Sequence, residues 1–213
     1  MPARLTNPYA HIRARLATTP ARIIIGIAGT PGAGKSTLAA QLATHINTHV
    51  APHTAVALGM DGFHLSKAQL RQLPDPDLAF ARRGAPWTFD APGFIRALQR
   101  IRTGHETTWP DFAHDVGDPV PDAIVVPASL QLVIVEGLYV LHDQDGWRGA
   151  KALLDEGWYL DTPMDVAMER LALRHMQAWG FTRAQAQHRI DTSDGLNATL
   201  VAASAQHADW LVS

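Results

Sequence analysis

The sequence predicts an α/β fold built on one open, mostly parallel β-sheet with helices on both of its faces. Short apolar runs alternate along the chain with longer amphipathic stretches, which is the order that successive strand and helix units produce. The first apolar run, residues 22–28 (RIIIGIA), shows no alternation of polar and apolar side chains. Such a run is typical of a parallel strand that is buried on both faces. The length of 213 residues suits a single domain, residues 1–213.

Five apolar runs qualify as strands, so we expect a five-stranded parallel sheet. They are residues 22–28, 54–60, 130–135, 157–161 and 209–212. Helices are expected between them, because apolar residues recur there at helical spacing. The predicted helices span residues 37–49, 91–103, 164–177 and 183–190.

Two segments depart from this regular alternation. Residues 61–129 form an insertion rich in Pro, Gly and aromatic residues, and connections of that length are usually functional. Within the insertion, residues 107–109 and 123–126 are expected to form a small β-pair. Residues 164–195 contain two predicted helices separated by a glycine, and we expect this region to act as a lid.

Composition excludes several classes of protein. There is no cysteine, so disulfides, thiolate nucleophiles and cysteine zinc sites are excluded. The net charge of -2 argues against a whole-surface attraction to nucleic acid or to an anionic membrane. Residues 1–20 lack the apolar core of a signal peptide, and no apolar run approaches the roughly 20 residues that span a bilayer. We therefore expect a cytoplasmic protein without nucleic-acid or membrane partners, and the sequence leaves a homodimer open.

A phosphate-binding loop follows the first predicted strand. Gly29, Gly34, Lys35 and Ser36 match the P-loop pattern G-x-x-x-x-G-K-[ST] between a strand and a helix. A glycine-rich turn that matches by chance is the weaker alternative, because the required context is present. Backbone N–H groups converge on a phosphate only where no Cβ obstructs them, and the lysine adds a cation. ATP is therefore the expected cofactor, bound by Gly29, Thr30, Pro31, Gly32, Ala33, Gly34, Lys35, Ser36 and Thr37.

Two acidic residues follow predicted strands. Asp61 comes directly after the run AVALGM, and Glu136 after LVIV. Ligands of open α/β sheets bind beyond the carboxyl ends of the strands, so both acids are expected to face the loop. Phosphoryl transfer to an alcohol needs a carboxylate that orients the hydroxyl and accepts its proton, which we assign to Asp61. Glu136 and the Ser36 hydroxyl are the expected Mg²⁺ ligands. The alternative for both Asp61 and Glu136 is that the carboxylate caps the following turn.

Three further motifs follow the phosphate-binding loop. Residues 60–65 read MDGFHL, residues 82–94 read RRGAPWTFDAPGF and residues 135–139 read VEGLY. With the loop and these motifs in this order, the chain resembles the phosphoribulokinase/uridine kinase family. MDGFHL followed by RRGAPWTFD is also similar to bacterial pantothenate kinases and to the fructose-transport kinase branch. The resemblance covers nearly the whole chain and implies a P-loop kinase with Asp61 as its catalytic aspartate. The implied reaction transfers the γ-phosphate of ATP to a hydroxyl of a sugar, polyol, pantothenate-like or nucleoside metabolite.

The resemblance also supplies candidates for the acceptor side. Uridine kinases bind sugar hydroxyls with the aspartate of a Phe-Asp-x-Pro segment, which residues 89–92 (FDAP) match. For Asp90 the alternative is an N-cap of the following helix, and for the aromatic candidates it is ordinary packing. Pro110 stands where uridine kinases place an aromatic residue against the base, which disfavours a nucleoside acceptor. The substrate-binding candidates are Asp61, Arg83, Phe89, Asp90, Asp111, Phe112 and His114.

The predicted lid contains arginines at helical spacing. Arg170 and Arg174 are four residues apart and share one helix face. Kinases of the resembled family carry arginines on this helix, so both are expected to stabilise the charge of the transferring phosphoryl group. The alternative for each arginine, Arg183 beyond the break included, is a solvated face paired with Asp165 or Glu169.

Two other functions share the P-loop. A nucleotide-dependent regulatory switch or assembly ATPase needs the loop but no acceptor pocket, so the long aromatic insertion argues against it. A nucleic-acid kinase is disfavoured, because no run of basic residues is interleaved with aromatic ones.

Overall fold

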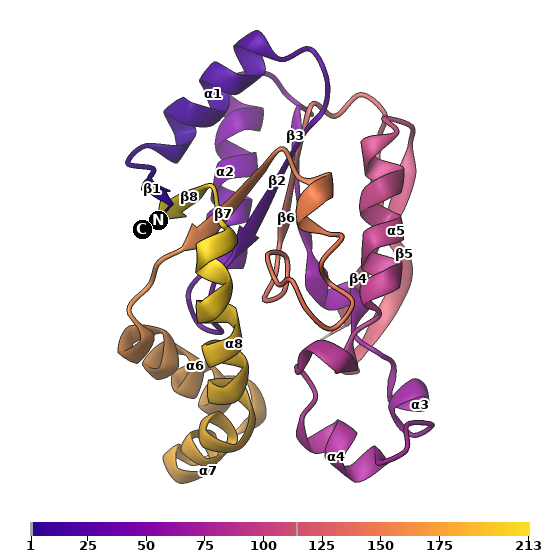
Figure 1. The fold of residues 1–213 in the computed structure, drawn as a ribbon, viewed down its shortest axis with the longest axis vertical. Coiled ribbons are helices and arrows are strands. Elements are labelled where there is room, and N and C mark those ends of the chain that lie inside the picture. The colour runs from indigo at the N-terminus through magenta and orange to yellow at the C-terminus, as the bar shows by residue number, and fades with distance from the viewer. Residues whose placement is uncertain (1, 114) are drawn as a thin grey trace.

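The computed structural model describes residues 2–113 and 115–213 and has a six-stranded parallel sheet as its centre (Figure 1). The strand order is β1-β8-β7-β2-β6-β3. These strands are β1 (Ala3–Arg4), β2 (Ile23–Ala28), β3 (Ala55–Gly59), β6 (Leu132–Glu136), β7 (Glu156–Leu160) and β8 (Trp210–Val212). All neighbouring pairs are parallel, so their carboxyl ends lie at one edge. The predicted α/β class is confirmed.

The sheet has six strands, whereas the sequence predicted five. The additional strand, β1, is two residues long, and both residues are exposed. Ala3 pairs with Trp210 and Arg4 with Leu211, and the Arg4 guanidinium forms a 2.7 Å ion pair with Asp161. Two exposed residues carry no apolar periodicity. Only their pairing with β8 at the edge of the sheet makes them a strand.

Side chains of β2 alternate between two cores, one on each face of the sheet. Ile23, Ile25 and Ile27 pack with α1 (Pro8–Thr18) and α2 (Lys35–His49). Ile24 packs on the other face with α5 (Ala91–Arg102) and α8 (Gly195–Ala203). Figure 1 shows α1 and α2 on one side of the sheet and α5 on the other. Burying one isoleucine side chain stabilises the folded state by about 1.5–3 kcal/mol. Because both faces of β2 are buried, the whole run is apolar.

The insertion begins directly after β3 and reaches below the carboxyl edge of the sheet (Figure 1). Its helical segments are η1 (Met60–Phe63), α3 (Lys67–Leu70), α4 (Pro76–Ala81), η2 (Pro86–Thr88) and α5. They are followed by a hairpin of β4 (Thr107–Ala113) and β5 (Asp118–Val126). This hairpin is longer than the predicted pair, because its pairing continues beyond a register shift between Trp109 and Asp111. Pro110 lies at that shift and lacks the N–H needed to continue a ladder, which breaks the strand pattern in the sequence.

The predicted lid region contains α6 (Met164–Trp179) and α7 (Arg183–Arg189). Gly180, with φ +68°, ends α6 in the left-handed conformation. The Thr182 side chain accepts a hydrogen bond from the Gln185 N–H and caps α7. A π-helical turn, η4 (Ile190–Asp194), joins α7 to α8. Two further short 3₁₀ helices precede strands of the sheet: η3 (Lys151–Leu153) precedes β7, and η5 (Ser204–His207) precedes β8.

Within residues 2–113 and 115–213, no helix combines the length and the apolar character needed to cross a membrane.

Candidate nucleotide and acceptor site

The loop between β2 and α2 has the geometry that its sequence predicts. Gly32 and Gly34 adopt φ of 80° and 100°, values that side chains other than glycine rarely tolerate. A Cβ on Gly32 would also overlap the carbonyl oxygen of Ala167 in α6. The loop is tied to the end of β7, because the Thr162 hydroxyl donates a 3.0 Å hydrogen bond to the Ala33 carbonyl. The result is a tight turn at the N-terminus of α2, where helix N–H groups favour an anion.

Lys35 lies buried at the first turn of α2. Its Nζ donates a 3.1 Å hydrogen bond to the carbonyl of Thr30 in the loop. Burial lowers the pKa of this ammonium, while the nearby Glu136 and Asp61 carboxylates raise it. The ammonium is therefore held among two acids and the loop, where the phosphates of a nucleotide would complete its charge balance.

Glu136 is the last residue of β6, the strand beside β2, and it contacts Ser36 of the P-loop. The Ser36 hydroxyl donates a 2.8 Å hydrogen bond to Glu136 Oε1. Burial raises the pKa of Glu136, while Lys35 and the Ser36 hydrogen bond lower it. A hydroxyl and a carboxylate this close form an oxygen donor set that suits Mg²⁺, which commonly takes its remaining ligands from phosphate and water. The residues present therefore fit the ion.

Asp61 follows β3, the neighbour of β6 in the sheet. Gly59 pairs in register with Glu136, so Asp61 lies two residues beyond the acid on the adjacent strand. Its side chain is 53% exposed, and its charge raises the pKa of both Lys35 and Glu136. The sheet thus brings the two acids that follow separate strands close to Lys35 at the start of α2.

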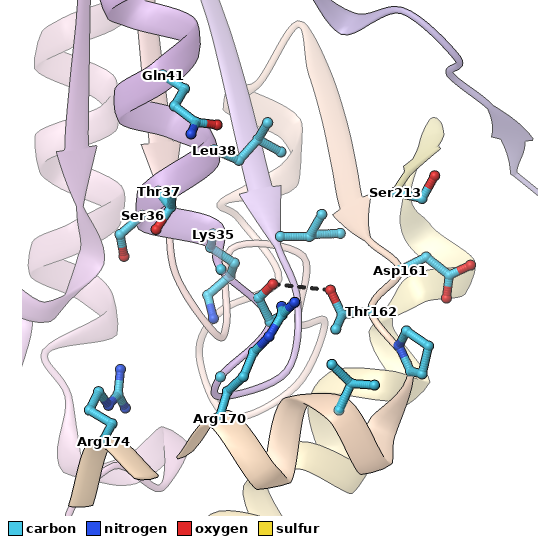
Figure 2. A pocket seen from close by; sticks show the side chains of 16 residues that line it. Lys35, Ser36, Thr37, Leu38, Gln41, Asp161, Thr162, Arg170, Arg174 and Ser213 are labelled. Carbon is cyan, nitrogen blue, oxygen red and sulfur yellow. Dashed lines mark hydrogen bonds between the residues drawn. The ribbon is translucent and has the colours of Figure 1, made fainter. Parts of the chain in front are cut away.

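A cavity of about 780 Å³ opens beside the loop (Figure 2). Its walls come from the start of α2, the segment after β7 and one face of α6. Arg170 and Arg174 extend from α6 toward the loop, with Lys35 and Ser36 on the facing side. Both arginines therefore face the predicted phosphate position. Arg183 instead forms a 2.5 Å ion pair with Glu169 inside the lid region, which is the alternative that the sequence left open.

The aromatic acceptor-side candidates pack around a histidine. The His64 ring lies between Phe89 and Phe112, with centroid distances of 3.9 and 4.8 Å. His64 Nδ1 donates a 2.8 Å hydrogen bond to the Asp61 carbonyl. Phe89 is buried, so most of its side-chain surface contacts other residues of the protein, which is the packing alternative given for the aromatic candidates. His64 was not among the predicted site residues, although it stands in the MDGFHL segment, which was the available signal.

The polar acceptor-side candidates already make contacts within the protein. Arg83 donates to the carbonyls of Gly117 and Leu65 at 2.6 and 2.9 Å. The Asp90 carboxylate accepts from the Gly93 N–H at 2.9 Å and so caps α5. Asp111 is exposed, and its carboxylate accepts from the N–H of the next residue. His114, the remaining candidate, lies outside the described residues.

Comparison with known proteins places this arrangement in a family. The model of the phosphoribulokinase/uridine kinase family matches residues 24–212. The chain belongs to this family. Its fold, too, is that of a P-loop kinase. A crystal structure of a "putative fructose transport system kinase" from Silicibacter sp. TM1040 superimposes with a TM-score of 0.85 and 30% sequence identity, covering 97% of this chain and 99% of that one.

Two curated fungal proteins are also similar to this kinase. A Schizosaccharomyces pombe "putative uridine kinase" is 40% identical over 184 residues, covering 84% of this chain and 78% of that protein. An Aspergillus versicolor "ATP-dependent kinase-like protein" is 42% identical over 146 residues, covering 65% of this chain and 84% of that protein. Together with the family match, they support an ATP-dependent small-molecule kinase, and the family implies ATP use and a small-molecule substrate.

A second cavity of about 500 Å³ lies on the acceptor side of this kinase. It is bounded by the segment after Asp61, by the start of α5 and by the hairpin. Asp90 and Arg96 line it, and their side chains are 3.8 Å apart. Asp61 is not among the residues that line this cavity, whereas the three residues that follow it, Gly62, Phe63 and His64, are. The cavity therefore lies against the turn that carries Asp61.

Proposed function

We propose that this kinase transfers the γ-phosphoryl group of ATP to a hydroxyl group of a small metabolite, with Asp61 as the catalytic base. The observation that carries the proposal is the position of Asp61. Its half-exposed carboxylate lies beyond the end of β3, beside Glu136, and acts electrostatically on Lys35. An accessible acid next to a phosphate loop can approach a hydroxyl that would be unreachable from a buried position.

The nucleotide side prepares the group to be transferred. Residues 29–37 bind the phosphates through backbone N–H groups, and Lys35 adds a cation. Ser36 and Glu136 are the residues that would hold Mg²⁺. The ion, when bound with ATP, neutralises the charge of the phosphate oxygens. Arg170 and Arg174, which face this cavity from α6, add planar donors for the charge that spreads over the phosphoryl oxygens in the transition state.

Asp61 acts on the acceptor. Its carboxylate orients the attacking hydroxyl toward the γ-phosphorus and accepts the hydroxyl proton as the new P–O bond forms, while the bond to ADP breaks. On the acceptor side, the exposed oxygens of Asp90 and Asp111 are available to hydroxyl groups of the substrate. Phe89 and Phe112 do not line the acceptor-side cavity themselves but pack on His64, which does, and Arg83 holds the adjacent Leu65 carbonyl. A sugar, a polyol or a pantothenate-like molecule fits this polar surface better than a nucleoside, because Pro110 offers no aromatic ring for stacking a base.

A coupled ADP-release assay tests the proposal. The kinase with Mg-ATP is screened against sugars, polyols, nucleosides and pantothenate, and a true acceptor raises the rate of ADP release and is recovered as its phosphate ester. Asp61→Asn is expected to lower that rate by about 10²- to 10⁴-fold with ATP binding retained. Asp77→Asn, at an exposed position on α4, is the matched control.

Two results would count against the proposal. Near-normal phosphorylation of the acceptor by Asp61→Asn would remove the assignment of the base. Turnover that responds to a protein but to none of the metabolites would favour a nucleotide-dependent switch.

A further inference from the structure

The lid region contacts the insertion through an arginine that neither the nucleotide site nor the acceptor candidates include. Arg189, at the end of α7, donates from Nη1 to the Ala81 carbonyl at 2.7 Å and from Nη2 to the Arg83 carbonyl at 2.8 Å. Ala81 is the last residue of α4, and carbonyls at a helix C-terminus lack donors within the helix and carry partial negative charge. A planar guanidinium fork can satisfy both carbonyls at once, whereas an ammonium cannot do so with the same geometry.

The other side of Arg189 is held within the lid region. Its Nε lies 3.7 Å from Asp194 Oδ2. The same oxygen lies 2.8 Å from Nε2 of His175, a buried residue of α6. Three segments of the lid region, namely α6, α7 and the π-helical turn, therefore converge on one carboxylate. The Arg189–Asp194 contact is an ion pair without a hydrogen bond, so it attracts the guanidinium toward the lid region, while the two hydrogen bonds to the Ala81 and Arg83 carbonyls orient the fork.

The contact continues from α4 to the turn that carries Asp61. The Arg83 carbonyl accepts a hydrogen bond from Arg189, and the Arg83 guanidinium in turn donates one from Nη2 to the Leu65 carbonyl. Its guanidinium carbon also lies 5.5 Å from the centroid of the Phe112 ring. Phe112 packs on His64, which binds the Asp61 carbonyl. An unbroken series of contacts thus connects α7 with the backbone of Asp61.

A weaker contact lies in parallel with this series. Arg82 Nη2 donates to the Asn197 side chain of α8 at 3.4 Å, a long hydrogen bond with a single donor. The bidentate Arg189 contact has two shorter bonds and is therefore the stronger of the two links.

We propose that Arg189 is a positioning residue that keeps the lid region and the insertion in one fixed arrangement and, through Arg83, sets the placement of Asp61. This inference rests on the proposed role of Asp61 as the base. It gives α6 and α7 two separate tasks, because Arg170 and Arg174 face the nucleotide while Arg189 supports the acceptor side. A displacement of reacting groups by about 1 Å costs about 10²-fold in rate, so loss of the fork should lower kcat without weakening nucleotide binding.

Kinetics of two Arg189 variants form the first test. Arg189→Gln removes the charge, and Arg189→Lys keeps the charge but not the fork. Both are expected to lower kcat for the acceptor found in the ADP-release screen by about 10- to 100-fold, with the KM for ATP changed less than twofold. Arg183→Gln is the matched control, since the Arg183 ion pair with Glu169 stays within the lid region, and it should leave both parameters unchanged.

A distance measurement forms the second test and needs no acceptor. Because the chain has no cysteine, spin labels attach only to cysteines introduced by Asp77→Cys on α4 and Ala184→Cys on α7, both exposed positions. With Mg²⁺ and a non-hydrolysable ATP analogue, the otherwise unchanged kinase should give one narrow distance distribution. Arg189→Gln and Arg189→Lys should broaden it, and Arg183→Gln should not.

The outcomes separate this inference from the proposed function. A broadened distribution together with a lower kcat is the expected result. An unchanged distribution, or an unchanged kcat in both Arg189 variants, overturns the positioning role. If the wild-type kinase phosphorylates none of the metabolites, that failure counts against the proposed function, and the distance measurement still decides whether Arg189 holds the two parts together. Where Arg189→Gln does not fold by circular dichroism, the more conservative Arg189→Lys decides.

Discussion

The nucleotide side and the acceptor side of the kinase are built in different ways. On the nucleotide side, one contiguous segment, residues 29–37, supplies most of the candidate contacts, many of them from the backbone. On the acceptor side, the side chains come from η1, the start of α5 and the hairpin, and they are held by contacts with one another. A site made from backbone geometry is encoded locally, whereas a site made from packed side chains depends on the whole fold.

The two sides also differ in the structural role that their polar side chains have before a ligand binds. Lys35, Ser36 and Glu136 contact the loop and one another in a compact charged group. Arg83 and Asp90, by contrast, already serve the protein, one as a link between segments and the other as a helix cap. Substitutions on the nucleotide side should therefore affect chemistry more than folding, and those on the acceptor side should affect both.

Among the substitutions that test this comparison, Lys35→Met should produce the largest effect. It removes the cation beside the phosphates, so phosphoryl transfer should fall by about 10²- to 10³-fold. Stability without nucleotide should not fall, because burial already disfavours the ammonium, whose pKa is lowered. Steady-state kinetics and thermal melting measure both, and Lys151→Met in η3, which does not line the nucleotide cavity, is the control. A large drop in melting temperature with normal activity would show that this nucleotide-side residue serves folding rather than chemistry, contrary to the comparison.

Glu136→Gln should have the next largest effect and should alter the pH dependence. Mg²⁺ affinity in the presence of ATP should fall by about 10- to 100-fold. Because burial raises the pKa of Glu136, kcat/KM of the wild-type kinase should rise with pH through a value above the ordinary carboxylate pKa of about 4.3. That limb should be absent from the pH–rate profile of Glu136→Gln.

Stability supplies an independent measurement for the same residue. The folded kinase holds the Glu136 proton more tightly than the unfolded chain does. The contribution of this group to the free energy of unfolding is therefore fully present below the unfolded pKa and is lost as the pH rises through the raised folded pKa. Unfolding without nucleotide should show this slope in the wild type and a reduced slope in Glu136→Gln. Equal slopes would mean that the carboxylate is not perturbed.

Asp90 allows the two roles of an acceptor-side residue to be separated. Asp90→Asn keeps a good N-cap, so stability should be unchanged while the KM for the acceptor rises about tenfold from the loss of a charge-assisted hydrogen bond. Asp90→Ala should add a loss of about 1 kcal/mol in the free energy of unfolding. Urea denaturation and acceptor kinetics on both variants are the measurements. An unchanged KM in both would leave Asp90 as a cap alone.

Arg4→Ala should have the smallest effect. The ion pair of Arg4 with Asp161 is exposed on both sides, with side-chain exposures of 61% and 39%, and such pairs contribute about 0–1 kcal/mol. Because Asp161 also lines the nucleotide cavity, ATP affinity measured by titration calorimetry tests whether this edge contributes to binding. A change beyond twofold would show that β1 supports the nucleotide side.

The sequence by itself determined the local features of this kinase. An apolar run, a glycine-rich loop and a helix-forming run stand next to one another, and the conformation of each depends mostly on its own residues. The positions of Asp61 and Glu136 after apolar runs likewise predicted which edge of the sheet they occupy, because parallel strands share their direction. These features could be read without knowing what packs against them.

Only the tertiary structure decided which segments meet. The two residues of β1 became a strand through β8, the hairpin extended past Pro110, and His64 gained its place through Phe89 and Phe112. Arg189 looks like an ordinary charged residue in the sequence, and its hydrogen-bond partners are carbonyl oxygens, which every residue has. No pattern of residue types can specify such a contact, because it depends on where the chain brings a backbone group rather than on which side chain that residue carries.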